Sequence, residues 1–154
     1  MDAKGYMLDL GLMDYEKAWE LQRHLWLRCA EGELPNFLLL VEHPHVITLG
    51  RRGHRDHLKV APEILEAMKV SIFHVERGGD ITYHGPGQMV VYPILDLKDY
   101  GYRFVQYVDQ LEEVILHVLK DFGIEGEAQK RSESRAGNKA IFRTLRRAAR
   151  SVAY

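Results

Sequence analysis

The densest run of residues that can do chemistry lies between residues 76 and 96, where the sequence reads ERGGDITYHGPGQMVVYPILD. Two glycine-rich turns, at 77–80 and 84–88, bracket a short β-prone segment at 81–83. Glycine in such turns lets the backbone approach a ligand closely and lets free N–H groups point at it. We therefore expect the two turns to line one shared pocket.

The side chains of this segment add hydrogen-bond donors and a titratable group. Arg77 offers a planar donor fork that matches a carboxylate or a phosphate. Tyr83 and His84 are expected to bring an aromatic wall and an imidazole to the same place, and Pro86 stiffens the second turn. Taken singly, each residue is typical of an ordinary hairpin. Together, glycine, arginine, tyrosine and histidine in neighbouring loops favour a binding site.

The surrounding elements must hold these turns in place. Apolar runs of strand length predict strands over 6–10, 37–41, 46–49, 70–75, 81–83 and 89–95. Helical spacing of apolar residues predicts helices over 15–30 and 102–122, with Asp14 and Gly123 as caps, and Pro62 suits the first turn of a helix over 63–68. The run at 37–41 is typical of a strand buried on both faces, and Pro93 predicts an edge strand or a bulge. This interleaving predicts an α/β (α+β) domain, a mixed sheet with packed helices.

Composition narrows the class of function. The chain has 154 residues, of which 46% are hydrophobic, enough for one domain with a sizeable core. Its formal net charge of −1 gives no support to nucleic-acid or membrane binding, and no apolar run is long enough to span a bilayer. The single cysteine, Cys29, predicts a reduced cytoplasmic compartment. Cys29 lies on the apolar face of the helix at 15–30, and we interpret it as a small core hydrophobe.

The segment RGGDITYHGPGQ resembles the RGG-x-x-TYHGPGQ signature of the lipoate-protein ligase B family, the lipoyl(octanoyl) transferases. Further segments stand in the order that the family shows. They are LLLVEHPHVITLGRRG before the motif, YPILDLKDYG directly after it, and DFGIEG at the end of the long helix. The motif is long and specific, and the resemblance covers about Tyr6 to Gly126.

This resemblance implies a biotin/lipoyl protein ligase-like (class II synthetase-like) fold and a two-step acyl transfer through a cysteine thioester. Octanoyl would pass from octanoyl-acyl carrier protein to the enzyme, and then to a lysine of the lipoyl domains of 2-oxoacid dehydrogenases and of the glycine cleavage H protein. A thiolate attacks a thioester readily, so neither ATP nor a metal or cofactor is implied. The resemblance assigns substrate binding to Arg77, Gly78, Gly79, Asp80, Ile81, Thr82, Tyr83, His84, Gly85, Pro86 and Gly87.

Past Gly126 the sequence departs from the family pattern, which continues with a lysine turn and later the cysteine nucleophile. We expect residues 1–129 to be the N-terminal portion of the octanoyltransferase catalytic domain and residues 130–154 to be a divergent basic tail. A shifted reading frame is one hypothesis for this change. Lys139 is the candidate for the lysine that lowers the thiol pKa. Cys29 lies far upstream of the family cysteine, so we expect little or no turnover from this polypeptide.

Two alternative functions stay open. An ATP-dependent lipoate or biotin ligase shares the fold, but it needs a different glycine loop, and TYHGPGQ matches the transferases better. A non-catalytic module that holds an acyl chain or a lipoyl domain is favoured by the missing cysteine. The intact mass of the protein after incubation with octanoyl-acyl carrier protein, with and without ATP, discriminates the three functions.

Overall fold

The computed structural model describes residues 5–128, and the chain divides into two units, residues 1–100 and residues 101–154. The first unit contains β1 (Gly5–Leu12), α1 (Tyr15–Ala30), β2 (Asn36–Glu42), β3 (Val46–Leu49), the 3-10 helix η1 (Arg55–His57), α2 (Pro62–Ala67), β4 (Ser71–His74), β5 (Ile81–His84), β6 (Met89–Ile94) and the 3-10 helix η2 (Leu97–Tyr100). The described part of the second unit contains α3 (Phe104–Asp121). The predicted mixed α/β architecture is confirmed, with element bounds shifted by a few residues.

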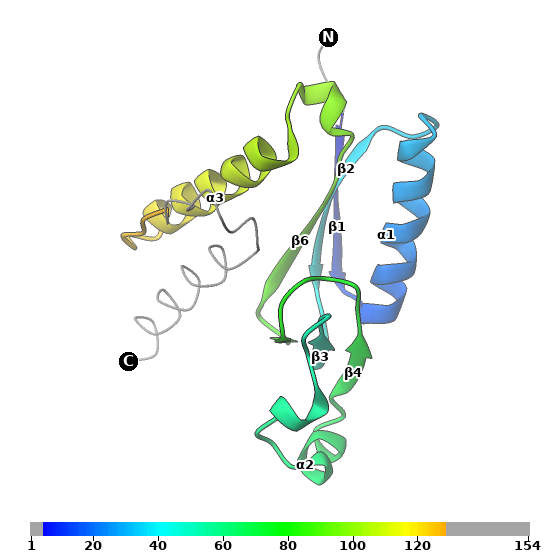
Figure 1. Ribbon diagram of the computed structural model, residues 1–154, viewed down its shortest axis with the longest axis vertical. Helices are drawn as coiled ribbons and strands as arrows, with labels where there is room; N and C mark the ends of the chain where they lie inside the picture. The colour runs from blue at the N-terminus through cyan, green and yellow to red at the C-terminus, as the bar shows by residue number, and fades with distance from the viewer. Residues whose placement is uncertain (1–4, 129–154) are drawn as a thin grey trace. The chain divides into compact units, whose positions relative to one another are not determined.

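The first unit is built from two three-stranded sheets with related topologies. One sheet has the order β1-β2-β6 and the other the order β4-β3-β5. Each contains a parallel pair, β1 with β2 and β3 with β4, and one antiparallel neighbour. Parallel neighbours cannot be joined by a tight hairpin, so a helix makes each connection, α1 in the first sheet and α2 in the second. Figure 1 shows α1 along one face of the β1-β2-β6 sheet.

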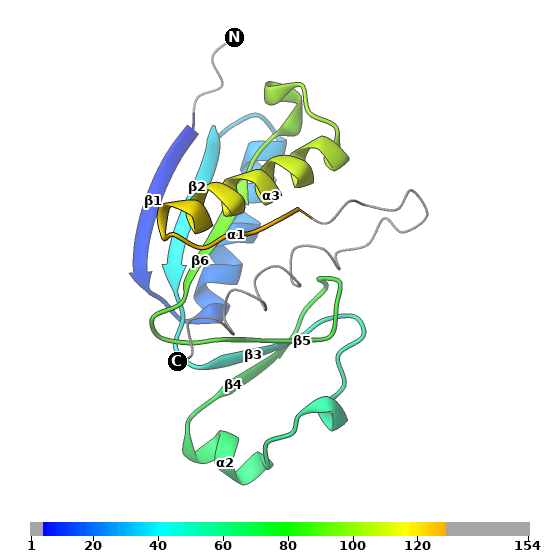
Figure 2. The ribbon, with the colours of Figure 1, turned by 90° about the vertical axis from the view of Figure 1, so that its left-hand side faces the viewer.

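The main core lies between α1 and the β1-β2-β6 sheet. Apolar side chains spaced along one face of α1 meet alternate residues of the sheet, and the buried members are Ala18, Leu25, Cys29, Leu39, Val41 and Ile94. Leu39 is fully buried at the centre of β2, where burial of a leucine side chain contributes about 1.5–3 kcal/mol. Figure 2 shows β1, β2 and β6 side by side.

The prediction for β2 is right for one face and wrong for the other. Leu39 and Val41 are fully buried, whereas Leu38 and Leu40 on the opposite face are half-buried. Residues of a strand alternate between its faces, and α1 packs on only one of them. The predicted edge position of Pro93 is confirmed, because β6 pairs with β2 alone among the described strands.

The long helix of the second unit is close to its predicted range. It begins two residues after Tyr102, and the backbone N–H of Arg103, the residue before its first turn, donates to Oε1 of Gln106 at 2.8 Å. It ends before Gly123, whose φ of 70° lies in the left-handed region. The predicted glycine C-cap is therefore confirmed, since this conformation is easy for glycine alone.

Asn36 fixes the chain that follows β6 to the start of β2. Its side chain is 3% exposed, accepts a hydrogen bond from the N–H of Asp96 at 2.7 Å and donates one to Oδ2 of Asp99 at 2.9 Å. A buried amide with both ends satisfied specifies this connection, since an unpaired one would be costly.

We predict that Asn36→Ala lowers the free energy of unfolding by about 1–3 kcal/mol, because it removes two hydrogen bonds and leaves a buried N–H unpaired. The urea midpoint followed by circular dichroism measures the loss. Asp99→Asn is the matched control, since an amide oxygen still accepts the hydrogen bond from Asn36 and should cost less than half as much. Equal midpoints for Asn36→Ala and the wild type would contradict this role.

Candidate functional site

The two faces of the β4-β3-β5 sheet differ, because one packs on α2 and the other carries both polar and apolar side chains. Residues alternate between the faces along each strand, and cross-strand partners share a face. One face packs on Leu65 of α2 through Ile47, Leu49, Ile72 and Ile81, and it also carries His74 and Tyr83. The opposite face carries the side chains of Val46, Thr48, Ser71, Phe73, Thr82 and His84. The motif segment therefore directs Thr82 and His84 away from α2 and its Ile81 into the core.

Tyr83 and His84 do not share a location, so the expectation that both rings meet in one place is wrong. They are consecutive in β5 and leave opposite faces of the sheet. The Tyr83 hydroxyl lies 2.6 Å from Nδ1 of His45, and the two rings stack. Nδ1 of His84 instead lies 2.6 Å from Oε1 of Gln88. The two-residue period of the strand overrides their adjacency in the sequence.

The first motif turn is joined to the loop at 50–53 through its carbonyl groups. Three backbone hydrogen bonds run from the N–H of Gly50 to the oxygen of Asp80 (2.8 Å), from Arg51 to Arg77 (3.0 Å) and from Arg52 to Gly79 (3.1 Å). A Cβ at Gly50 would lie 2.8 Å from the carbonyl oxygen of Gly79. Only glycine permits this approach, because such a contact is too short for any side chain.

The N–H groups of the same turn are left available. Those of Gly78 and Gly79 have no acceptor among the described residues. Gly79 has a φ of 89°, in the left-handed region that favours glycine. The turn thus uses its carbonyls to bind the neighbouring loop and keeps two N–H donors for another acceptor.

The guanidinium of Arg77 is directed at the protein rather than at open space. Its Nη2 donates to the carbonyl oxygen of Thr48 at 2.7 Å and to Oγ1 of Thr48 at 2.8 Å, and Nε also donates to Oγ1 at 3.2 Å. Nη1 donates to the carbonyl of Gly78 at 3.0 Å. The fork expected to bind a carboxylate or phosphate therefore fixes the turn to β3, and one Nη1 hydrogen remains for a ligand.

His84 is the titratable group on the sheet face opposite α2. Burial lowers its pKa below the usual value, and His43 and Arg77 act in the same direction, while the hydrogen bond to Gln88 opposes them. The ring is therefore neutral at pH 7. Oε1 of Gln88 can only accept, so Nδ1 carries the hydrogen and Nε2 keeps its lone pair. A neutral imidazole of this kind is a base or a hydrogen-bond acceptor.

Next to His84 lies a group of aromatic residues that the sequence analysis did not select. The His43 ring is fully buried and meets the rings of Tyr15, His84 and Tyr92 at centroid distances of 5.3, 6.1 and 5.9 Å. Tyr15 also meets Phe73 at 5.2 Å. His43 directly follows β2, Phe73 lies in β4, His84 ends β5, Tyr92 lies inside β6, and Tyr15 is the first residue of α1. The sequence feature that could have identified this group is a polar residue at the end of an apolar run, such as His43 after the run at 37–41.

Hydrogen bonds define how the His43 ring is oriented. The carbonyl oxygen of Met13 lies 2.8 Å from Nδ1, which must carry a hydrogen because a carbonyl only accepts. In the neutral ring Nε2 then accepts from the Tyr92 hydroxyl, 2.8 Å away. Burial raises the pKa of Tyr92, and Tyr15 adds to this, so the hydroxyl stays protonated. Both ring nitrogens of His43 therefore have a hydrogen-bond partner, and the Tyr92 hydroxyl beside the ring is uncharged.

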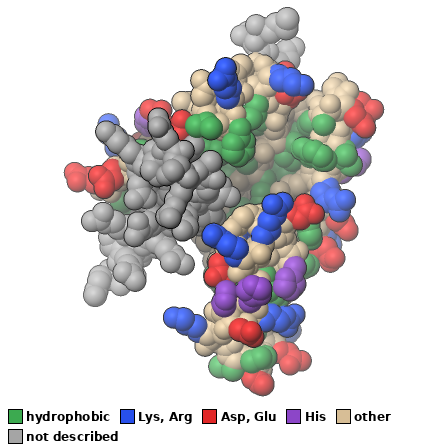
Figure 3. Space-filling model, viewed as in Figure 1, with side chains coloured by type: hydrophobic (Ala, Val, Ile, Leu, Met, Phe, Trp, Pro, Cys, Tyr) green, Lys and Arg blue, Asp and Glu red, His purple; other side chains and the backbone are tan. Residues whose placement is uncertain are grey.

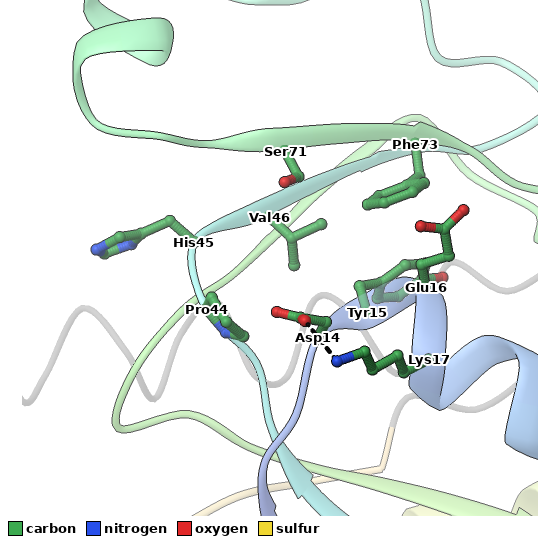
Figure 4. Close-up of a pocket in the computed structure, with 9 residues that line it drawn as sticks. All are labelled: Asp14, Tyr15, Glu16, Lys17, Pro44, His45, Val46, Ser71 and Phe73. Atoms are coloured by element: carbon green, nitrogen blue, oxygen red, sulfur yellow. Dashed lines mark ion pairs between the residues drawn. The ribbon is translucent and has the colours of Figure 1, made fainter.

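A pocket of about 320 Å³ lies at the N-terminal end of α1, and Figure 4 shows the side chains around it. Val46 and Phe73 point toward Tyr15, and the His45 ring points away. The lining residues are Asp14, Tyr15, Glu16, Lys17, Pro44, His45, Val46, Ser71 and Phe73. Neither motif turn belongs to this lining, and the turns stand at opposite ends of β5. That they line one pocket stays a prediction.

Cys29 is held as a thiol inside the core. It is 8% exposed, and Sγ donates to the carbonyl of Pro35 at 2.9 Å. Burial raises its pKa, so little thiolate is present at neutral pH. These observations support its interpretation as a core residue. Lys139, the other residue considered for the chemistry, lies outside the described residues.

Within residues 5–128, no group of three or more His, Cys, Asp or Glu side chains is arranged to hold a metal ion. Over the same residues, no helix has both the length and the apolar character needed to cross a bilayer.

Comparison with known proteins connects this geometry to a family. Residues 14–141 match the model of the lipoyl protein ligase A/B catalytic domain, a range that includes Lys139. An octanoyltransferase of Syntrophobacter fumaroxidans is 53% identical over 123 residues, covering 80% of this chain and 54% of the relative. An octanoyltransferase of Solibacter usitatus is 50% identical over 116 residues, covering 75% of this chain and 53% of the relative. The chain spans about half the length of the curated relatives it matches.

A solved structure shares the fold. The crystal structure of P. falciparum LipL1 in complex with lipoate superposes with a TM-score of 0.59 at 16% identity, covering 81% of this chain and 39% of that chain. At this identity the likeness concerns the fold, and it confirms the expected ligase-like α/β architecture.

We predict that Arg77→Lys lowers the free energy of unfolding of the first unit by about 1.5–3 kcal/mol, since an ammonium cannot reproduce the hydrogen bonds to Thr48 and Gly78. The exposed Arg52→Lys is the matched control, because only the backbone of Arg52 contacts the turn. Its effect should stay within about 0.5 kcal/mol. Urea unfolding of both variants checks this. Equal losses of stability would contradict the role of the Arg77 side chain in fixing the turn to β3.

We predict that the His84 ring titrates below about pH 6.5 in the folded protein. Its contribution to stability is present above that pH and falls as the pH drops through it, since the unfolded chain binds the proton more readily. Gln88→Leu removes the hydrogen bond that opposes the shift and should lower the pKa further. Ring signals followed by NMR between about pH 4.5 and 8 measure both midpoints. An upward shift in Gln88→Leu would show that the assigned contact is wrong.

Proposed function

The chain belongs to the lipoyl protein ligase A/B catalytic-domain family, and we propose that it is part of an octanoyltransferase of lipoate biosynthesis. Such an enzyme moves an octanoyl group from the thioester of acyl carrier protein onto the ε-amine of a lysine in a lipoyl domain. The proposal is supported by relatives of that name at 53% and 50% identity. The acceptors we propose are the lipoyl domains of 2-oxoacid dehydrogenases and the glycine cleavage H protein, and the proposed compartment is the cytoplasm.

The observation that carries the proposal is the set of unused polar groups along β5 and the turn before it. The N–H groups of Gly78 and Gly79 have no acceptor among the described residues, and they suit the carbonyl oxygen of a thioester. Donors fixed in advance stabilise the negative charge that develops on this oxygen during acyl transfer. The hydrogen bonds from Arg77 to Thr48 and Gly78 hold the turn in that geometry.

His84 supplies the second function of this site. Its neutral ring presents Nε2 as an acceptor on the face that carries Thr82. His84 stands at the opposite end of β5 from the Gly78 and Gly79 N–H groups, so we assign its Nε2 to a hydrogen bond with an N–H or O–H group of the pantetheine arm rather than to the reacting carbonyl. The aromatic wall of His43, Tyr15 and Tyr92 then keeps the ring in a dry setting that favours its neutral form.

The covalent step requires a thiolate, and the only cysteine in the sequence does not suit it. Cys29 is buried and donates a hydrogen bond to the carbonyl of Pro35, and burial raises the pKa of its thiol. We therefore assign binding and carbonyl activation of the acyl donor to this polypeptide and expect little or no turnover from it alone. An ATP-dependent ligase is the competing enzyme, since the family includes both types.

We predict that His84→Ala weakens binding of octanoyl-pantetheine roughly five- to tenfold, the cost of about one hydrogen bond with its packing. Tyr83→Ala is the matched control, because it removes an aromatic ring from the next position of β5 on the opposite face. It should change the affinity less than about twofold. Calorimetric titration measures both, with circular dichroism to confirm folding. A larger loss of affinity in Tyr83→Ala than in His84→Ala would place the ligand on the α2 face of β5 and contradict the proposed site.

The class of reaction is tested by intact mass after incubation with octanoyl-acyl carrier protein and a lipoyl domain. We expect no dependence on ATP and no octanoyl adduct on Cys29. An adduct that forms only with ATP would favour the ligase, and an adduct lost in Cys29→Ser would overturn the assignment of Cys29 to the core. Failure of wild type to bind octanoyl-pantetheine in the titration would overturn the proposed acyl site.

A further inference from the structure

The segment between β3 and α2 carries a concentration of positive charge. Residues 50–60 contain four cationic side chains and one carboxylate, Asp56, which gives a formal charge of +3 in a chain whose net charge is −1. The cations are Arg51, Arg52, Arg55 and Lys59. All four cations are exposed. Among the described residues none of them has a carboxylate within ion-pair distance. Figure 3 shows Lys or Arg side chains next to histidines over the part of the surface that holds β3, β4 and α2.

This segment is fixed to the candidate site at two points. The N–H groups of Arg51 and Arg52 donate to carbonyls of the Arg77–Asp80 turn, as described above. Nδ1 of His57, the last residue of η1, lies 2.9 Å from Oδ1 of Asp80. The cations are therefore held beside the turn that has the free N–H donors, and they are not carried on a loose loop.

We propose that Arg51, Arg52, Arg55 and Lys59 form a docking surface for an acidic carrier protein that delivers the acyl thioester to the Arg77–Asp80 turn. This inference rests on the proposed function and specifies where its donor binds. Unpaired surface cations of one sign attract a partner of the opposite sign and raise its rate of association. An acyl group on a phosphopantetheine arm brings a phosphate as well as the acidic surface of its carrier.

Other occupants fit this surface less well. A single-stranded nucleic acid stacks its bases on aromatic side chains, and residues 50–60 contain no Phe, Tyr or Trp. The lipoyl domain that accepts the acyl group presents a lysine and lacks the phosphate-bearing arm. A free phosphate or pantetheine phosphate would need only one or two of the cations. The test must separate these ligands from the carrier protein.

The experiment measures the affinity of the full chain for three donors: octanoyl-acyl carrier protein, octanoyl-phosphopantetheine and octanoyl-pantetheine. The triple variant Arg51→Glu/Arg52→Glu/Arg55→Glu is compared with wild type, and Arg52→Glu with Arg23→Glu, an exposed arginine of α1. We expect the triple variant to bind the carrier protein at least about tenfold more weakly, with a strong dependence on salt. Octanoyl-pantetheine should change less than about twofold, and Arg23→Glu should leave carrier binding unchanged.

The remaining outcomes would contradict either the docking surface or the proposed acyl site. An equal loss for octanoyl-phosphopantetheine would mean a phosphate site and overturn protein docking, as would a loss in Arg23→Glu as large as in Arg52→Glu. Loss of lipoyl-domain binding in place of carrier binding would also overturn it. If carrier binding depends on the arginines but octanoyl-pantetheine does not bind wild type, docking stands and the proposed acyl site fails. If both bind equally well in wild type and triple variant, docking alone fails.

Discussion

The guanidinium of Arg77 donates to both oxygens of Thr48 and to the carbonyl of Gly78, and the rest of the candidate site depends on these bonds. They fix a glycine-rich turn to the centre of a sheet, since Thr48 belongs to β3. The carbonyl groups of this turn accept hydrogen bonds from the loop at 50–53, whereas the N–H groups of Gly78 and Gly79 have no acceptor among the described residues. An arginine suits this task because its planar fork reaches several acceptors at once.

One face of the β4-β3-β5 sheet packs on α2 and stabilises the fold, and the opposite face carries the residues to which we assign binding. Ile47, Leu49 and Ile81 form the small core with α2, and this core holds β5 in register. The register in turn places Thr82 and His84 on the opposite face. His84 stays neutral because it is buried next to other aromatic rings and a cationic guanidinium. Packing on one face thus fixes the strand that places His84 on the other face, where its burial lowers its pKa.

Much of the fold followed from periodicity, and the parts that did not follow depend on contacts distant in sequence. Spacing and residue type predicted the helix at 15–30, the long helix, expected over 102–122 and found over 104–121, and the edge position of Pro93. The motif was located correctly as strand and turns. The partner of Arg77 could not be predicted, because Thr48 lies 29 positions away. The opposite directions of Tyr83 and His84 were predictable from strand alternation, which the reasoning from loop composition left out.

The central claim is that an octanoyl thioester binds along the Arg77–His84 side of β5, with its carbonyl at the N–H groups of Gly78 and Gly79. The most direct measurement is an NMR titration of the labelled chain with octanoyl-pantetheine, following backbone amides and the His84 ring. The account predicts the largest shifts at Gly78, Gly79 and the Nε2 side of His84. Shifts confined to the α2 face, at Leu65 and Ile72, with these signals unmoved, would contradict it.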